Sequence, residues 1–144
     1  MTVLLDVNLL VALSWREHVL HQASQQWFAC LEGGWATTTT TESGFLRVSM
    51  NPHVTSSPVS WRAALDMLAA IRATPGHQWW AEEVDLPASP LVRRAPVVGY
   101  RQVSDVHLAA LTAHHRGRLA TLDHGVAEAL HPDDRDLVTL VRPR

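Results

Sequence analysis

Short apolar runs alternate along the chain with longer stretches in which apolar residues recur every three or four positions. The run at 3–5 precedes apolar residues spaced for a helix between 9 and 13, which predicts a strand, a turn and a helix. An amphipathic helix is predicted over 20–31, and the threonine-rich stretch 35–40 predicts a second strand. The same criteria place the remaining elements as follows: helices over 42–50 after a Thr41 cap, over 57–74 starting at Ser57-Pro58, near Leu91, over 105–115 between Ser104 and Gly117, and over 126–130, with strands over 78–84, 119–122 and 137–141.

The order of these elements indicates the fold class. Helices separate the strands almost throughout, which is typical of an α/β fold with a short, mostly parallel sheet flanked by helices. At 144 residues the chain is long enough for one core, so we predict a single domain over residues 1–144. Apolar residues make up 47% and charged residues 18%, a composition that favours a packed globule over a disordered chain.

The sequence also bears on the compartment. Cys30 is the single cysteine, which excludes an internal disulfide, and no stretch approaches the roughly 20 apolar residues that span a bilayer. The first apolar run follows Met1 so closely that a secretory signal peptide is not expected. We therefore predict a cytoplasmic protein without membrane contact.

The net charge of −2 argues at first against a nucleic-acid partner, because phosphate binding usually leaves a basic footprint. The balance reverses if a metal neutralises four of the fourteen acids, since ten acids then face twelve basic residues. All twelve basic residues are arginine, and the chain contains no lysine. Charge alone thus excludes no partner, whereas the missing lysine excludes some enzyme classes.

Four acidic residues occupy positions that can converge. Asp6 and Asp123 directly follow predicted strands, and ligand sites of parallel sheets form outside the carboxyl ends of the strands. Glu42 and Asp105 lie in the first turns of predicted helices, where the macrodipole tolerates negative charge. All four acids are therefore expected at one edge of the sheet.

Four carboxylates in one cleft repel one another unless a cation is bound among them. Oxygen ligands suit Mg²⁺ and Mn²⁺, and one or two such ions can activate a water and stabilise the leaving oxygen of a phosphodiester. Each acid also has an ordinary structural explanation as a helix-start or cap residue, except Asp6, whose place in an apolar junction is costly. The inference rests on their joint placement.

Other polar and aromatic residues are candidates for supporting roles. Asn8 can hold Asp6 or a metal-bound water, or can simply satisfy the turn, and Arg47 can reach a carboxylate or phosphate. Most tryptophans are expected in the core, and the nine histidines show no metal-ligand spacing. Trp15 is a candidate for stacking on a base, and several arginines are candidates for contact with RNA phosphates, although solvated surface explains each arginine equally well. The candidate RNA-binding residues are Arg93, Arg94, Arg101, Arg116, Arg118 and Trp15.

With these residues in place, the sequence resembles the PIN-domain nucleases, in particular the VapC-type toxins of bacterial toxin–antitoxin pairs. The resemblance covers essentially the whole chain. Each matching segment is weak alone, but together and in this order they are specific: Leu-Asp-Val-Asn-Leu-Leu-Val-Ala-Leu at 5–13, Thr-Glu-Ser-Gly-Phe-Leu-Arg-Val at 41–48, Asn51-Pro52, Ser-Asp-Val-His-Leu-Ala-Ala-Leu at 104–111, and Ala-Thr-Leu-Asp at 120–123.

The resemblance implies a PIN-like fold and metal-dependent RNA cleavage that suppresses translation. It matches the four acids to the family's metal-binding positions and makes Asn8 and Thr121 their supporting polar groups. It also implies a homodimer, a cognate VapB-like antitoxin and a heterotetramer or larger assembly with it. The sequence departs from the family pattern at two places: Val106 stands where a smaller alanine is common, and Asp123 is followed by His124-Gly125 rather than by a further acid.

Three other classes share parts of this pattern. Receiver-type phosphoacceptors and haloacid-dehalogenase-like phosphatases also end their first strand in an aspartate, but both normally need a lysine near the phosphoryl group. A P-loop enzyme is excluded for the same reason, because its loop lysine contacts phosphate. The remaining alternative is a catalytically inactive PIN-like module that binds RNA or protein. Such a module usually lacks one or more acids, and none is missing here.

Overall fold

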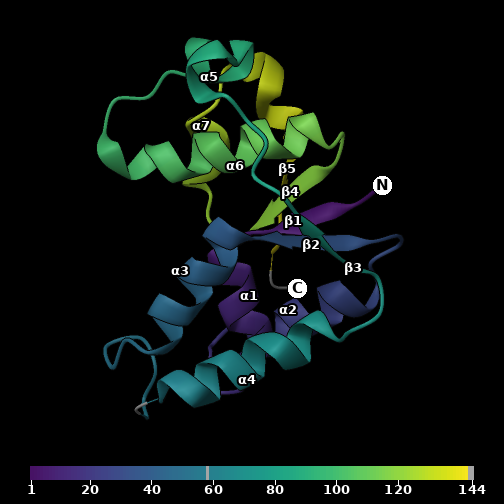
Figure 1. Ribbon diagram of the computed structural model, residues 1–144, viewed down its shortest axis with the longest axis vertical. Helices are drawn as coiled ribbons and strands as arrows, with labels where there is room; N and C mark the ends of the chain where they lie inside the picture. Colours follow the sequence, from purple (N-terminus) through teal and green to yellow (C-terminus); the bar gives the residue numbers. More distant parts are fainter. Residues whose placement is uncertain (58, 143–144) are drawn as a thin grey trace.

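A five-stranded parallel sheet forms the centre of the computed structural model, which describes residues 1–57 and 59–142 (Figure 1). The strands lie in the order β3-β2-β1-β4-β5, and every neighbouring pair runs parallel. This arrangement confirms the predicted fold class. The strands are β1 (Val3–Leu5), β2 (Trp35–Thr38), β3 (His77–Trp80), β4 (Arg118–Thr121) and β5 (Val138–Leu140).

Helices cover both faces of this sheet. Figure 1 shows the first four on one face and the later ones on the other. The first group comprises α1 (Val7–Ser14), α2 (His21–Ala29), α3 (Thr39–Ser49) and α4 (Trp61–Arg72). The second group comprises α5 (Pro90–Arg94), α6 (Val103–His114) and α7 (Gly125–Glu128), with the 3₁₀ turns η1 (Leu86–Ala88), η2 (Tyr100–Gln102) and η3 (Pro132–Leu137) among them.

Strand β1 shows why both faces are covered. Its side chains alternate between faces: Val3 and Leu5 join the core with α1, α3 and α4, whereas Leu4 packs with residues of α6 on the other side. All three are buried. A continuous apolar run is the expected sequence for a central strand of a parallel sheet, because neither of its faces meets water.

The second strand is shorter than predicted, and the helix after it begins earlier. Strand β2 ends at Thr38, which caps α3, and the helix starts at Thr39. The predicted cap, Thr41, is instead buried inside the first turn, where its hydroxyl accepts a hydrogen bond from the Thr38 N–H at 3.0 Å. A run of threonines suits a strand, a cap and a first turn equally well, so composition did not place the boundary.

Two boundaries between β2 and β3 also differ from the prediction. Helix α4 begins at Trp61 after a Ser60 cap, whose hydroxyl accepts from the Ala63 N–H at 3.1 Å, and the predicted start at Pro58 lies outside the described residues. Strand β3 ends at Trp80 rather than at residue 84. Its partner β2 ends opposite Trp80, so no strand is available to pair with the residues that follow.

Helix α6 begins at Val103, two residues before its predicted start, because the η2 turn leads directly into it. At its other end Arg116, and not Gly117, has the left-handed conformation, with φ of 55°. Gly117 is needed for a different reason. A Cβ there would lie 2.4 Å from the Thr2 carbonyl oxygen and 2.9 Å from the Trp80 ring. Among the described residues, no helix is long and apolar enough to cross a membrane.

Candidate active site

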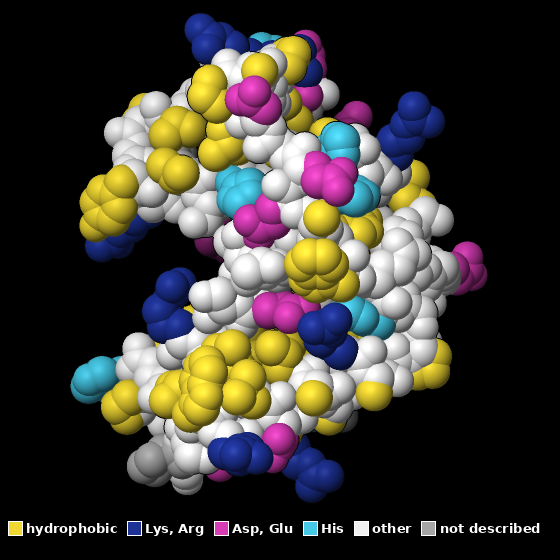
Figure 2. All heavy atoms as spheres, in the orientation of Figure 1, with side chains coloured by type: hydrophobic (Ala, Val, Ile, Leu, Met, Phe, Trp, Pro, Cys, Tyr) yellow, Lys and Arg dark blue, Asp and Glu magenta, His cyan; other side chains and the backbone are white. Residues whose placement is uncertain are grey.

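The carboxyl edge of the sheet opens into a hollow between two groups of helices. Strands β1 and β4 are neighbours at the centre of the sheet, so the residues after Leu5 and Thr121 meet at this edge. Helix α6 begins beside it and carries Asp105 in its first turn. Figure 2 shows the hollow on the side to which the strands point in Figure 1, with acidic side chains at its inner end.

Asp6 is the most buried acid of this edge, with 8% of its surface exposed. It caps α1: one carboxylate oxygen accepts the Val7 N–H at 2.8 Å, and the other accepts the Thr121 hydroxyl at 2.7 Å. Burial raises the pKa of the Asp6 carboxyl, the two hydrogen bonds oppose that rise, and the charge of Asp123 adds to it. The Asp6 side chain is therefore fixed in position, although burial disfavours its charged form.

Thr121 connects the groups at the ends of the two central strands. Its hydroxyl donates to Asp6 and accepts from the Asn8 amide at 3.2 Å and from the Asp123 N–H at 3.1 Å. The Asn8 amide oxygen in turn accepts the Leu122 N–H at 3.2 Å. One buried hydroxyl thus sets the relative positions of the β1–α1 junction and the segment after β4.

Asp105 and Asp123 complete a cluster of three aspartates. Burial raises the pKa of Asp105 to about 6, and the charges of Asp6 and Asp123 contribute to the rise. Asp123 is exposed, and its carboxylate accepts the Gly125 N–H at 2.8 Å. The charges of the three aspartates act on one another, as expected of acids that share one small region.

The charges of these three aspartates are not balanced by protein cations. Within residues 1–57 and 59–142, no arginine or histidine forms an ion pair with any of them. In the same residues, no three acidic, histidine or cysteine side chains already converge as a metal cage. Uncompensated oxygen donors of this kind suit a hard divalent cation that brings its own waters and shares the substrate phosphate.

Glu42, the fourth predicted acid, lies apart from the three aspartates. Its carboxylate accepts the Thr37 hydroxyl at 2.6 Å and pairs with Arg72 at 3.3 Å. Thr37 also lies 2.7 Å from His77, whose pKa is lowered by burial and by the Arg72 charge. Glu42 thus belongs to a polar group between α3, α4 and β3, and no described contact joins it to the aspartate cluster.

Glu82, which lies just beyond β3, is a residue that the sequence analysis did not predict for the site. Its carboxylate accepts the Thr40 N–H at 2.6 Å and the Thr38 hydroxyl at 3.3 Å, so it caps α3 from a distant part of the chain. It also lies 3.9 Å from His107 on α6. Burial acts to raise the pKa of Glu82, but these hydrogen bonds hold it below its usual value. No sequence pattern links residue 82 to residue 40.

The predicted RNA-binding arginines fall into two groups. Arg94 binds the buried Asp134 through two hydrogen bonds, Arg93 donates to the Pro87 carbonyl at 2.9 Å, and Arg118 donates to the Asp136 carbonyl at 3.3 Å. Their donors are thus partly used within the protein. The second group, Arg101 and Arg116, is exposed, and Arg101 lies over a neighbouring aromatic ring. Arg47, predicted as a supporting residue for a carboxylate or phosphate, is also exposed.

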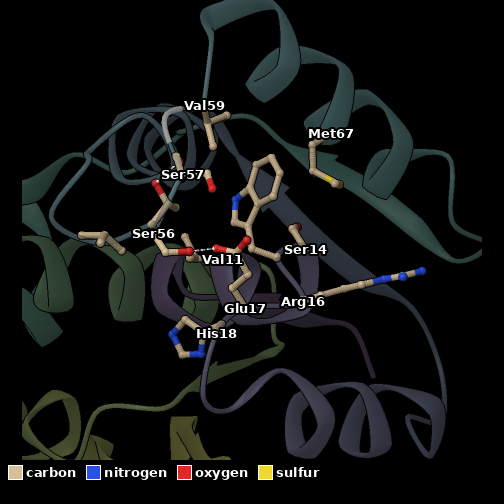
Figure 3. Close-up of a pocket in the computed structure, with 12 residues that line it drawn as sticks. Val11, Ser14, Arg16, Glu17, His18, Ser56, Ser57, Val59 and Met67 are labelled. Atoms are coloured by element: carbon tan, nitrogen blue, oxygen red, sulfur yellow. Dashed lines mark hydrogen bonds between the residues drawn. The ribbon is translucent and has the colours of Figure 1, made fainter.

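Trp15, the predicted stacking residue, lies at the end of α1 opposite to Asp6. Its indole N–H donates to the Ser49 hydroxyl at 2.8 Å, and its ring stacks on Phe45 with 6.5 Å between centroids. It lines a cavity of about 460 Å³ whose wall also includes Val11 and Met67 (Figure 3). Trp15 is therefore a wall of a separate cavity rather than a part of the acidic edge.

The raised pKa values predict how pH affects stability without metal. A carboxyl with a higher pKa in the folded state binds more protons than in the unfolded chain, so its contribution to stability is lost as pH rises from about 4 to beyond 6. Asp105 is half-buried, so solvent screening weakens the effect of its raised pKa. Its contribution to the free energy of unfolding is then about 1 kcal/mol.

Chelator-treated protein should accordingly have a lower free energy of unfolding in urea at about pH 7.5 than at about pH 5, and Asp105→Asn should reduce this difference. Histidines titrate in the same range, so the comparison of the two proteins, rather than the slope of either one, is the measurement. If the free energy of unfolding changed equally with pH in the parent and in Asp105→Asn, the proposed repulsion among the three aspartates would be contradicted.

Solved structures first define the class of fold. The crystal structure of Mycobacterium tuberculosis VapC20, a toxin described as cleaving the sarcin–ricin loop, superposes with a TM-score of 0.66. The match covers 90% of this chain and 99% of that one, at 15% sequence identity. The protein therefore has the PIN-like fold of a VapC structure.

Curated sequences identify the family, although no protein-family model matches the chain. Ribonuclease VapC39 of M. tuberculosis is 42% identical over 130 residues, covering 90% of this chain and 94% of the relative. Ribonuclease VapC38 of the same organism is 46% identical over 126 residues, covering 85% of this chain and 86% of the relative. Ribonuclease VapC29, also of that organism, is 41% identical over 133 residues, covering 92% of this chain and 93% of the relative. The chain belongs to the VapC ribonuclease family, which confirms the resemblance inferred from its motifs.

Proposed function

We propose that this protein is a metal-dependent endoribonuclease that hydrolyses RNA phosphodiester bonds and thereby inhibits translation. The observation that carries the proposal is the group of Asp6, Asp105 and Asp123, whose like charges share the carboxyl edge of the sheet without an ion pair to any cation of residues 1–57 and 59–142. Membership of a family of ribonucleases supports RNA as the substrate. A stable fold tolerates such repulsion most readily when a divalent cation relieves it.

The three aspartates are proposed as the residues that hold Mg²⁺ or Mn²⁺. When bound, one or two such ions supply a water of lowered pKa and stabilisation of the leaving oxygen. Thr121 and Asn8 are positioning residues: they fix Asp6 and the Asp123 backbone through the hydrogen bonds described above. No side-chain nucleophile is required, so hydrolysis by water is expected.

Glu42 remains the predicted fourth acid of this site. To join the aspartates it must exchange its bonds to Thr37 and Arg72 for new ones. Exposed Arg47 and Arg116 are proposed to contact RNA phosphates. For Arg93, Arg94 and Arg118 the same role requires them to share or give up the hydrogen bonds that they make within the protein.

Cleavage of total RNA by purified, antitoxin-free protein tests the proposal. Cleavage should require added Mg²⁺ or Mn²⁺, stop with EDTA and return when the metal is restored, because the carboxylates alone do not activate water. Products should carry 5′-phosphate and 3′-hydroxyl ends, which end-specific ligation and sequencing can distinguish from 2′,3′-cyclic phosphates.

Cyclic ends would mean that the RNA's own 2′-hydroxyl attacks, which contradicts the water mechanism. Cleavage that persists after complete chelation would contradict the metal requirement. Tight, reversible RNA binding without any cleavage under all metal conditions would instead support a catalytically inactive binding module.

The proposed partners are a cognate VapB-like antitoxin and a second copy of the chain, assembled as a heterotetramer or larger complex. Support for a protein contact comes from an apolar groove between α3 and α4. Trp61, 55% exposed, lies in this groove with Met50 and Leu65. Figure 2 shows hydrophobic side chains gathered over these helices. Cys30 is exposed and unpaired among the described residues, in keeping with the proposed cytoplasmic location.

A further inference from the structure

Tyr100 projects into solvent directly beside the start of α6. It is 82% exposed, although tyrosine normally buries much of its ring. The η2 turn that carries it continues into α6, whose first turn carries Asp105. From the rise of a 3₁₀ and an α-helix, the two backbone positions are about 9 Å apart along the axis. That spacing corresponds to two or three stacked nucleotides.

The backbone around Tyr100 is held in place by hydrogen bonds. The Gln102 side-chain oxygen accepts the Val98 N–H at 2.8 Å and the Gly99 N–H at 3.2 Å, and the Gln102 N–H donates to the Gly99 carbonyl at 3.1 Å. The exposed ring thus stands on an ordered turn rather than on a loose loop. An ordered platform loses less conformational entropy when a ligand stacks on it.

Arg101 adds a positive charge to this ring. Its guanidinium carbon lies 5.8 Å from the Tyr100 ring centroid, and its Nε lies 3.4 Å from the tyrosine hydroxyl. Throughout 1–57 and 59–142, no carboxylate lies within ion-pair distance of Arg101. Figure 2 shows a hydrophobic and a basic side chain together at the outer lip of the hollow, where α6 begins in Figure 1.

From these observations we infer that Tyr100 and Arg101 bind an unpaired nucleotide two or three positions from the scissile phosphate, the ring stacking on its base and the guanidinium contacting its phosphate. This inference rests on the proposed nuclease function and deepens it. Base stacking on an aromatic ring needs an accessible base face, which a duplex does not offer. The platform therefore favours single-stranded RNA, loops and bulges as substrates and disfavours continuous duplex. A nucleotide suits Tyr100 and Arg101 better than a protein contact does, because an exposed ring and an adjacent guanidinium together match a base and its phosphate.

Binding to a labelled single-stranded RNA of mixed sequence, measured by fluorescence anisotropy in an Asp6→Asn background that leaves the RNA intact, tests this inference. Tyr100→Ala should weaken binding about 10-fold, the size expected for one lost stack, whereas Tyr100→Phe should bind within about twofold of the parent. Val98→Ala is the matched control, because Val98 is 93% exposed in the same turn and offers no ring; its binding should be unchanged. Binding of the fully duplexed RNA should not respond to Tyr100→Ala.

In the cleaving protein, Tyr100→Ala should raise KM for single-stranded RNA more than it lowers kcat, because a stack two or three nucleotides from the reacting bond chiefly contributes binding. Equal affinity of Tyr100→Ala and its parent, or an equal loss in Val98→Ala, would overturn the inference. So would a change of oligomeric state in Tyr100→Ala, by light scattering, with RNA affinity per protomer unchanged. A wild-type protein that cuts no RNA would instead refute the proposed function itself.

Discussion

Asp6→Asn is expected to lower the rate of RNA cleavage by about 10³-fold or more, because it removes the charge of a proposed metal ligand from the centre of the proposed site. The fold should tolerate the change. Asparagine caps helices as well as aspartate does, and its side-chain oxygen can still accept the Val7 N–H. Loss of a buried charge should leave the metal-free variant at least as stable as the parent at neutral pH.

Multiple-turnover cleavage assays and urea unfolding of the same preparations would measure both effects. Asp66→Asn is the matched control, since Asp66 is an exposed acid of α4 and forms no hydrogen bond or ion pair within the part of the chain that the structure describes. That variant should cleave at the parent rate. A normal rate in Asp6→Asn would refute the site, whereas inactivity accompanied by unfolding would assign Asp6 a purely structural role.

Thr121→Val should lower cleavage by about 10-fold to 100-fold, the range for lost partners of metal ligands. The valine keeps the shape of threonine but removes the hydroxyl that joins Asp6, Asn8 and the Asp123 N–H. These groups would then lack a buried partner, which typically costs about 1–3 kcal/mol of stability. The metal concentration needed for half-maximal activity should rise, because Asp6 is no longer fixed.

Two further variants separate positioning from packing. Thr121→Ser keeps the hydroxyl and should restore most of the activity and the metal response. Thr139→Val makes the same substitution on the neighbouring strand β5, where the side chain forms no hydrogen bond with any other described residue, and should leave the activity and the metal response unchanged. If Thr121→Val matched the parent in metal response, Thr121 would be a packing residue only.

The sequence predicted the parts of the site that follow from strand ends. Asp6 and Asp123 come together because parallel strands end at one edge, and Asp105 joins them from the first turn of a helix at that edge. Such placement needs only the order of elements and the rule for parallel sheets. The Thr121 hydroxyl network came from family resemblance, because a threonine inside an apolar strand has no distinguishing pattern of its own.

Glu42 shows where that reasoning stops. Its place in the first turn of α3 was predicted correctly, but its side chain turns to Thr37 and Arg72. The direction depends on where α3 begins, which is three residues earlier than predicted, and each residue of a helix turns the side chain by about 100°. Long-range partners such as Glu82 and Thr40 were likewise invisible, because no local pattern connects them.

The hydrogen bond from Thr121 to Asp6 joins residues 115 positions apart in the chain. A nascent chain whose β4 has not yet emerged from the ribosome therefore contains Asp6 but lacks Thr121, so it cannot complete the site. Contacts of such long sequence separation form late in folding. The protein should thus be harmless to nearby RNA until β4 has been synthesised and has paired with β1, which leaves the proposed antitoxin time to bind it first.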